Sequence, residues 1–567
     1  MLARRFRAPS SVALFVSLAA PLAATPQCEL LTVEESAPAF QDLFGWSVSI
    51  EGDRAAIGAI QTDVNCPTGV DCNAGSVTVV ENIGGATTTQ VLFASDGATM
   101  DQFGQHVSLS GDTLAVGAHF AGAGKVYMFE RQGGSWIETQ ILTSSDGQIL
   151  FHFGHSLELE GDRLLVGSML DNHAGPQSGS AYVFEREGGV WVERRKLTAS
   201  DAAAQERFGR ATDLSGDVAF VGAHLDSTLA PASGAVHVYE FDDGGTPADP
   251  ADDAWPEVAR LAPSASSMNG FFGLAVEVTG DTAFVGAPGE LDPSGANTGA
   301  VYVYERSVDP MGAPVWTEID RFIAPGTEAG DGFGESLASN EGRLLVGAPG
   351  DDDGGSNAGA AYSYERDPSG AWVLTAKLVP DAAGDVDLTG REMTLALAGD
   401  LALVGSPART TSETQAGAAT VFDLAGCLGT PDCVPVPNST GAGGVLRGRG
   451  SVLAAANDLT IEGSALPPFV FCLFLASRDP GFIPNLAGGP GTLCIGGQFG
   501  RYNTFVQSTG ATGTATLPVD VTAIPETNVL TPAVAGDSVW FQLYHRDTIP
   551  MSAVQANLTE SLRVDFR

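Results

Sequence analysis

Hydrophobic and polar positions alternate along most of this chain in short segments of about four to eight residues. Such alternation is typical of β-strands with one buried face, whereas an amphipathic helix would place apolar residues three and four positions apart. In one example, Val107 and Leu109 alternate with Ser108 and Ser110, a Gly-Asp turn follows, and a short apolar run occupies residues 114–118. The pattern predicts an all-β protein.

This pattern occurs seven times, at periods of 50 to 64 residues. Most copies start with Phe-Gly and end with Val-Gly-Ala or a close variant. They begin at Phe44, Phe103, Phe153, Phe208, Phe272, Phe333 and Arg391, and the last copy lacks the Phe-Gly. Two more strand segments follow each of the first six copies, and the second opens with tryptophan in five repeats: Trp136, Trp191, Trp255, Trp316 and Trp372. Four short strands per repeat predict a seven-bladed β-propeller, with the tryptophans packed between blades.

The two ends of the repeat array predict how the ring closes. The seventh repeat has three strand segments, and residues 30–36, before the first repeat, resemble an isolated fourth strand. We therefore expect the N-terminal strand to complete the seventh blade and to pair its open edge. The propeller would then span residues 28–426.

The Phe-Gly and Val-Gly-Ala ends of the repeats resemble FG-GAP repeats, which build the integrin α-subunit propeller and occur in many secreted bacterial proteins. In integrins, the turn between the first two strands of a blade holds a calcium loop. In six of the seven copies here a tight Gly-Asp turn such as Gly111-Asp112 replaces it. One carboxylate per turn cannot supply the six to eight oxygens that calcium takes. We expect no metal at these turns, little effect of a chelator on thermal stability, and no cofactor.

Three regions lie outside the repeats. Residues 1–24 combine arginines, a short apolar run and small residues, which predicts a secretory signal peptide. The Pro/Gly-rich residues 427–441 predict a linker. Residues 442–567 contain short apolar strands without the repeat and predict a β-sandwich module. This module resembles one that recurs at the C-terminus of secreted bacterial proteins, a resemblance that implies no particular activity.

The excess of acidic over basic residues disfavours negatively charged binding partners. The chain has 68 acidic and 28 basic residues, a net charge of −40. Such a surface repels nucleic-acid phosphates and anionic lipid, and after the signal peptide no apolar stretch is long enough to span a membrane. We expect a monomeric protein, secreted or held at the cell surface, with an extracellular protein or glycan as its ligand.

Candidate binding residues lie in the loops between the second and third strands. His119 and His224 hold the same repeat position, directly after Val-Gly-Ala, and the run Asp351, Asp352, Asp353 is the densest carboxylate group of these loops. Such residues could bind a ligand, or form the acid–base site of a polysaccharide lyase or hydrolase. The alternative is unrelated surface histidines and ordinary acidic loops. The sequence has no familiar catalytic motif, so a recognition or adhesion protein is the preferred hypothesis.

The chain has seven cysteines, an odd number. Cys66 and Cys72 bracket a short loop of the first repeat, which predicts a local disulfide. Cys28 starts the closing strand and Cys427 follows the third strand of the seventh repeat. Because these strands are expected to be antiparallel neighbours, we predict a second disulfide between them. Cys494 would pair with one of two others, and the sequence leaves the choice open: Cys433 and Cys472.

Overall fold

The computed structural model describes residues 29–424, apart from gaps at 36–38, 64–72, 84, 148–150, 246–252, 325, 341, 353–354, 368–369, 381–382 and 412. Further along it describes residues 430–431, 445–449, 460–464, 466, 469, 471–478, 480–483, 493–495, 500–502, 507–509, 514–520, 522–526, 529–532, 538–547 and 555–565. All regular elements within these ranges are β-strands, as predicted. The described residues contain no helix long and apolar enough to cross a membrane.

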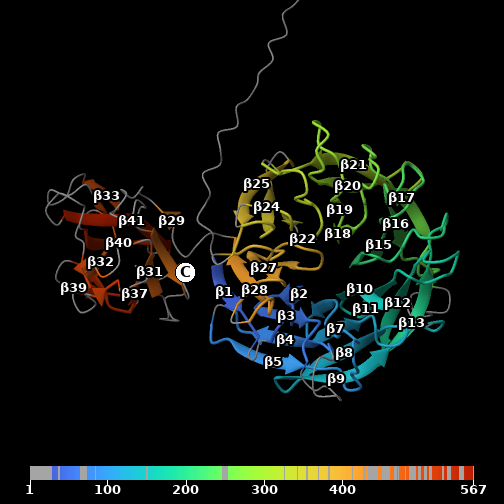
Figure 1. The fold of residues 1–567 in the computed structure, drawn as a ribbon, viewed down its shortest axis with the longest axis horizontal. Helices are drawn as coiled ribbons and strands as arrows, with labels where there is room; N and C mark the ends of the chain where they lie inside the picture. Colours follow the sequence, from blue (N-terminus) through green and yellow to red (C-terminus); the bar gives the residue numbers. More distant parts are fainter. Residues whose placement is uncertain are drawn as a thin grey trace, which may run out of the picture.

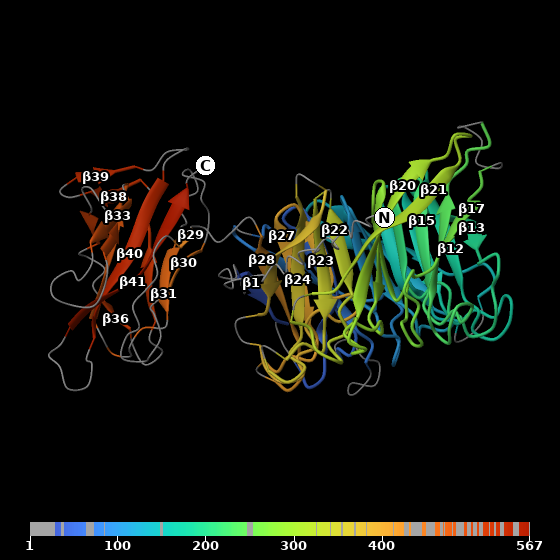
Figure 2. The ribbon, with the colours of Figure 1, turned by 90° about the horizontal axis from the view of Figure 1, so that it is seen from above.

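Seven four-stranded antiparallel sheets form the blades of a ring (Figure 1), which appears as a thick disc when seen edge-on (Figure 2). The first strand of each blade lines the central channel. Blades one to three contain β2 (Phe44–Glu51), β3 (Arg54–Ala59), β4 (Ser76–Glu81), β5 (Thr88–Leu92); β6 (Val107–Ser110), β7 (Thr113–Ala118), β8 (Lys125–Gln132), β9 (Ser135–Leu142); and β10 (Phe153–Glu160), β11 (Arg163–Ser168), β12 (Ser180–Glu187), β13 (Val190–Leu197).

Blades four to six follow the same order. Their strands are β14 (Thr212–Ser215), β15 (Val218–Ala223), β16 (Ala235–Glu240), β17 (Glu257–Leu261); β18 (Ala275–Thr279), β19 (Thr282–Ala287), β20 (Ala300–Val308), β21 (Pro314–Phe322); and β22 (Leu337–Asn340), β23 (Arg343–Ala348), β24 (Ala360–Arg366), β25 (Trp372–Leu378).

Blade seven combines the two ends of the repeat array. Three of its strands are β26 (Leu395–Ala398), β27 (Leu401–Ser406) and β28 (Ala418–Asp423), and the fourth is β1 (Glu29–Val33). β1 pairs antiparallel with β28, with Thr32 opposite Thr420. Figure 1 shows the N-terminal strand in blue beside the orange strand of the last repeat. The predicted closure of the ring is confirmed.

Glycines let neighbouring blades approach to backbone contact. A Cβ atom on Gly405 of blade seven would lie 2.1 Å from the carbonyl oxygen of Gly45 in blade one. The equivalent contact joins the Val-Gly-Ala glycine of every blade to the glycine that follows the first residue of the next repeat. A further glycine before each third strand, such as Gly417 with φ +88°, bridges to the next blade at a residue such as Phe44. The two ends of the repeat motif are therefore the two sides of one interblade contact.

Aromatic side chains fill the spaces beside these contacts. The repeat phenylalanines are buried, and Phe103 packs edge-on against Tyr127 with ring centroids 5.3 Å apart. Trp316 of blade five meets Phe220 of blade four, and Trp372 of blade six meets Phe284 of blade five, with centroids 4.9 and 5.0 Å apart. The prediction that the tryptophans pack between blades is confirmed.

Blade seven departs from the sequence alignment at its start. Thr389 forms the bridge to the preceding blade that the repeat phenylalanines form elsewhere, and Gly390 meets the glycine backbone of that blade. Thr389-Gly390 thus occupies the Phe-Gly position, and the prediction that the seventh repeat starts at Arg391 without this pair was wrong. Two additional residues follow Gly390 here, and they bring Arg391 and Glu392 to the mouth of the channel.

The described parts of residues 430–565 form separate sheets. Their strands are β29 (Thr430–Pro431), β30 (Val445–Arg449), β31 (Thr460–Ser464), β32 (Phe471–Ser477), β33 (Pro480–Ile483), β34 (Leu493–Ile495), β35 (Gly500–Arg501), β36 (Gln507–Ser508), β37 (Ala515–Pro518), β38 (Ile524–Glu526), β39 (Val529–Thr531), β40 (Ser538–Asp547) and β41 (Gln555–Asp565). β31, β32, β37 and β40 contribute side chains to one hydrophobic core. The sandwich module and the domain boundaries at 427–441 and 442 stay predictions.

Several predictions fall outside the described residues. The signal peptide at 1–24 and all four cysteines of the two predicted disulfides are among them: Cys28, Cys66, Cys72 and Cys427. These assignments stay predictions.

Candidate ligand-binding rim and channel mouth

One end of the propeller gathers the long loops. Because the strands within a blade are antiparallel, the segments after each second and each fourth strand lie at the same end, which we call the loop rim. It comprises the connections from β1 to β2, from β3 to β4, and their equivalents around the ring up to residue 417. The Gly-Asp turns lie at the opposite end.

Large apolar side chains stand exposed on the loop rim. They are between 39% and 65% exposed and belong to blades one, two, four, five and seven: Phe40, Met100, Phe120, Leu229, Met268, Leu291 and Val386. Soluble proteins expose single apolar residues routinely, and others are exposed on the outer strands and their turns, including Val190, Val308 and Met311. The seven rim residues differ in that they belong to loops carried by a rigid scaffold, where binding residues are usually found, and this favours the rim as the interaction surface. Sequence analysis missed this group, although apolar residues within otherwise polar loops were a visible signal.

A cavity of about 430 Å³ opens at the channel mouth on the loop rim. Its charged lining consists of Arg210, Glu335, Arg391 and Glu392. Arg210 forms an ion pair with Glu392. Burial lowers the pKa of the Arg210 guanidinium to about 10. Burial also raises the pKa of Glu335. Sequence analysis missed these residues because they come from three different blades.

The two predicted histidines both lie at this mouth. His119 packs against the rings of His152 and His155, with centroids 4.8 and 5.4 Å away, and His155 Nε2 lies 3.2 Å from a guanidinium nitrogen of Arg210. His224 lines the cavity itself. Burial, reinforced by the positive charge of Arg210, holds the pKa of His224 well below its usual value and lowers that of His119 to about 3. Both imidazoles are therefore neutral at physiological pH.

The predicted aspartates differ in their surroundings. Asp351 is buried and accepts hydrogen bonds from Lys377 Nζ and Tyr362 Oη, both at 2.6 Å. Asp352 is exposed and accepts a hydrogen bond from the Asn357 backbone amide at 2.6 Å. Asp353 lies outside the described residues. Asp351 and Asp352 are thus neighbours in sequence, but only Asp351 is buried.

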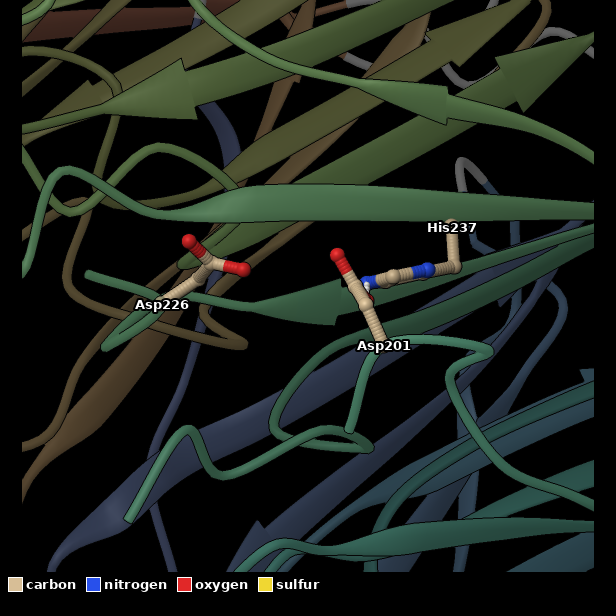
Figure 3. A group of neighbouring side chains, drawn as sticks. All are labelled: Asp201, Asp226 and His237. Carbon is tan, nitrogen blue, oxygen red and sulfur yellow. Dashed lines mark ion pairs between the residues drawn. The ribbon is translucent and has the colours of Figure 1, made fainter. Parts of the chain in front are cut away.

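One group in the described residues has the spacing of a metal site. Figure 3 shows Asp201, Asp226 and His237 of blade four, whose potential ligand atoms all lie within 4.8 Å of one another. Arg260 already binds both carboxylates, at 2.9 Å from Asp201 and 2.7 Å from Asp226. His237 is buried and its Nδ1 lies 2.9 Å from Glu257. Side chains of the protein thus already hold the carboxylates and the imidazole in an ion-pair network, so we assign the group a structural role.

Buried and half-buried carboxylates line the channel below the mouth. The inner strands surround a cavity of about 250 Å³, and blades three, four and five place Glu158, Asp213 and Glu277 in it at equivalent repeat positions. Glu277 Oε1 accepts a hydrogen bond from the Ser339 amide of the next blade at 2.8 Å. Burial raises the pKa of all three groups, to about 8 for Glu277, whose pKa the charge of Glu158 raises further.

This burial predicts how stability depends on pH. An unfolded glutamate has a pKa of about 4.3, so the folded protein binds protons more tightly and loses stability as the pH rises toward 8. Glu277→Gln removes one such group and keeps an acceptor for Ser339. We expect the free energy of unfolding of the variant to exceed that of wild type by about 2 kcal/mol at pH 9 and to differ little from it at pH 5. Urea denaturation measures this, with the exposed Glu328→Gln as control; equal curves for Glu277→Gln and wild type at pH 9 would contradict it.

Several turn aspartates at the opposite end bind arginines of the preceding blade. Asp112 pairs with Arg54 at 2.9 Å, and Asp400 pairs with Arg343 at 2.6 Å. These contacts link neighbouring blades below the channel. The turn carboxylates thus have a structural partner within the chain.

Fold and site together define the class of protein: a repeat-built, seven-bladed propeller with a loop rim at one end. The chain belongs to the FG-GAP repeat family, whose model matches about half of it, at residues 35–79, 87–129, 136–184, 191–239, 255–304 and 316–364. From residue 87 onward, each match begins in the fourth strand of one blade or within two residues before it, and ends in the third strand of the next blade. No curated protein matches the chain. An FG-GAP propeller is an interaction-type fold, and such repeats are typical of extracellular proteins.

Proposed function

We propose that this protein is a secreted, non-enzymatic recognition protein that binds a protein ligand with its loop rim. The observation that carries the proposal is the group of seven exposed apolar side chains on that rim. Apolar and aromatic side chains are enriched at the centres of protein interfaces. The ring beneath them is fixed by backbone contacts between blades, so the rim can present its loops with little loss of conformational entropy on binding.

The electrostatics of the channel mouth favour binding over catalysis. A general base at neutral pH needs a pKa near 7, whereas that of His119 is lowered to about 3. Glu392 is held in an ion pair with Arg210, so it does not stand beside a histidine as a free acid. The alternative of a polysaccharide lyase or hydrolase therefore has less support.

Cross-linking tests the location of the interface. A photoreactive amino acid at Leu229 or Met268 should form adducts with an extracellular protein of the source organism. Met311, which is 92% exposed in a turn at the opposite end, is the matched control. Once the adduct partner is purified, Leu229→Lys combined with Met268→Lys should weaken its binding at least tenfold without changing the melting temperature.

Two results would contradict the proposal. Equal adducts at Met311 and at the rim would show that the rim is not the interface. Binding on a glycan array without any protein adduct would show that the ligand is a glycan.

A further inference from the structure

Positive side chains gather at the channel mouth of a protein whose net charge is −40. Arg210 and Arg391 line the cavity there, and Arg207 belongs to the same turn as Arg210, whose amide donates a hydrogen bond to the Arg207 carbonyl oxygen at 3.2 Å. The Arg391 guanidinium lies 4.6 Å from the centre of the Trp46 ring. Arg210 pairs with Glu392, whereas Arg207 and Arg391 form no ion pair with any residue that the structure describes.

The carboxylates of this cavity do not balance these charges. They are Glu335 and Glu392, and the second is already held by Arg210. Burial raises the pKa of Glu335, which favours its neutral form. Together with burial, the positive charges of Arg210 and Arg207 lower the pKa of the His224 imidazole. The mouth is therefore a locally positive site, although the protein as a whole repels anions.

Imidazoles at the mouth offer hydrogen-bond donors that the chain does not use. His224 lines the cavity and is 5% exposed, and neither of its ring nitrogens has a partner among the described residues. His155 Nε2 accepts from Arg210 at 3.2 Å, because a guanidinium can only donate, so the proton of His155 is on Nδ1. That buried Nδ1 has no partner within the described residues either. A buried donor without an acceptor is costly, and an anion at the mouth would supply acceptor atoms.

We propose that the channel mouth binds a carboxylate group, with the Arg391 guanidinium as its ion-pair partner and the His224 imidazole as a hydrogen-bond donor. A guanidinium and a carboxylate form two parallel hydrogen bonds, which makes arginine a specific partner for this anion. The cavity of about 430 Å³ has the size of a small-molecule site. Phe271, Leu274 and Pro288 give it an apolar wall for the carbon atoms that carry the carboxylate. A metal explains the histidines less well, because the described group with the spacing of a metal site is the one in Figure 3.

Two sources can present this carboxylate: a free organic acid, or an acidic side chain of the protein that docks on the loop rim. The second source rests on the proposed function. Phe120, one of the seven exposed apolar residues of the rim, connects the two surfaces, since its ring centroid lies 4.0 Å from that of His119 and 4.8 Å from that of His152. A protein that covers the apolar residues would therefore also cover the mouth.

Titration calorimetry of the full chain with glutarate tests the site without a protein partner. We expect saturable binding with a dissociation constant of about 1 mM or lower. Sodium chloride at about 0.15 M limits the repulsion by distant carboxylates, because the Debye length is then about 8 Å. Binding should also change the fluorescence of Trp46, which stacks on Arg391, and a Trp46→Phe variant identifies its share of the signal.

Three variants locate the bound carboxylate. Arg391→Gln should weaken glutarate binding at least tenfold and keep the melting temperature of wild type, because Arg391 has no ion pair among the described residues to lose. His224→Phe keeps an aromatic ring, removes the donor and should also weaken binding. Arg366→Gln is the matched control: it removes an equal charge at the opposite end, where Arg366 is exposed and pairs with Glu305, and should bind glutarate as wild type does.

The proposal is overturned if wild type shows no saturable glutarate binding, or if Arg391→Gln binds glutarate as tightly as wild type. Tighter binding of inorganic phosphate than of glutarate would overturn it too, because a carboxylate would then not be the preferred anion. Once the cross-linked partner is purified, excess glutarate should displace it if the partner presents the carboxylate, and unchanged partner binding would assign the site to a free acid. A rim without protein adducts would contradict the proposed interface and leave the calorimetric result standing.

Discussion

Deleting β1, residues Glu29–Val33, will lower the free energy of unfolding by about 4 kcal/mol, since this strand supplies the outer edge of blade seven. Val33 is buried, and Leu30 and Leu31 pack half-buried against the same core. Without them, β28 presents an unpaired edge to solvent. Urea denaturation of the full chain measures the loss.

A variant that lacks only residues 1–27, and therefore keeps Cys28, is the control for the β1 deletion, and it should unfold at the same urea concentration as the unmodified protein. An unchanged midpoint in the variant without Glu29–Val33 would show that the pairing with β28 contributes little to stability.

The substitution Gly405→Ala will destabilise the protein by at least about 3 kcal/mol. Its Cβ would stand 2.1 Å from the Gly45 carbonyl oxygen, a backbone atom of the neighbouring sheet that cannot rotate away as a flexible side chain could. The strands must therefore separate by roughly an ångström or more to restore an ordinary van der Waals distance. Melting temperature and urea midpoint should both fall.

Gly399→Ala is the matched control, because Gly399 lies in a turn of the same blade with open space around it. Its φ of +57° makes alanine cost about 1 kcal/mol. Equal destabilisation by the two substitutions would contradict the interblade contact as the cause.

Repetition made the ring predictable from sequence. The Phe-Gly and Val-Gly-Ala motifs mark the interblade contacts, and seven copies fix the number of blades. The unpaired strand segment at residues 30–36 contains Val33, whose apolar side chain fits the core of blade seven. The start of blade seven was mispredicted, because Thr389 keeps the backbone role of phenylalanine without its side chain.

The side-chain environment of the candidate site could not be predicted in the same way. Arg210 and Glu392 form an ion pair at the channel mouth although 182 residues separate them in the sequence, and no local sequence pattern predicts such a pair. Asp351 and Asp352 look alike in sequence, but only Asp351 lies below the surface, beside Lys377.

The closure of blade seven also determines when the ring can be completed during synthesis. Thr32 leaves the ribosome 388 residues before its neighbour Thr420. Until then the growing chain has no partner for β1, and the first and last blades lack their mutual contact. The loop to be closed is long, and the entropy that its closure costs is offset only when the contacts of the final step form. Ring closure is therefore a late, cooperative event, and a chain that stops within blade seven leaves the N-terminal strand free to pair with another molecule.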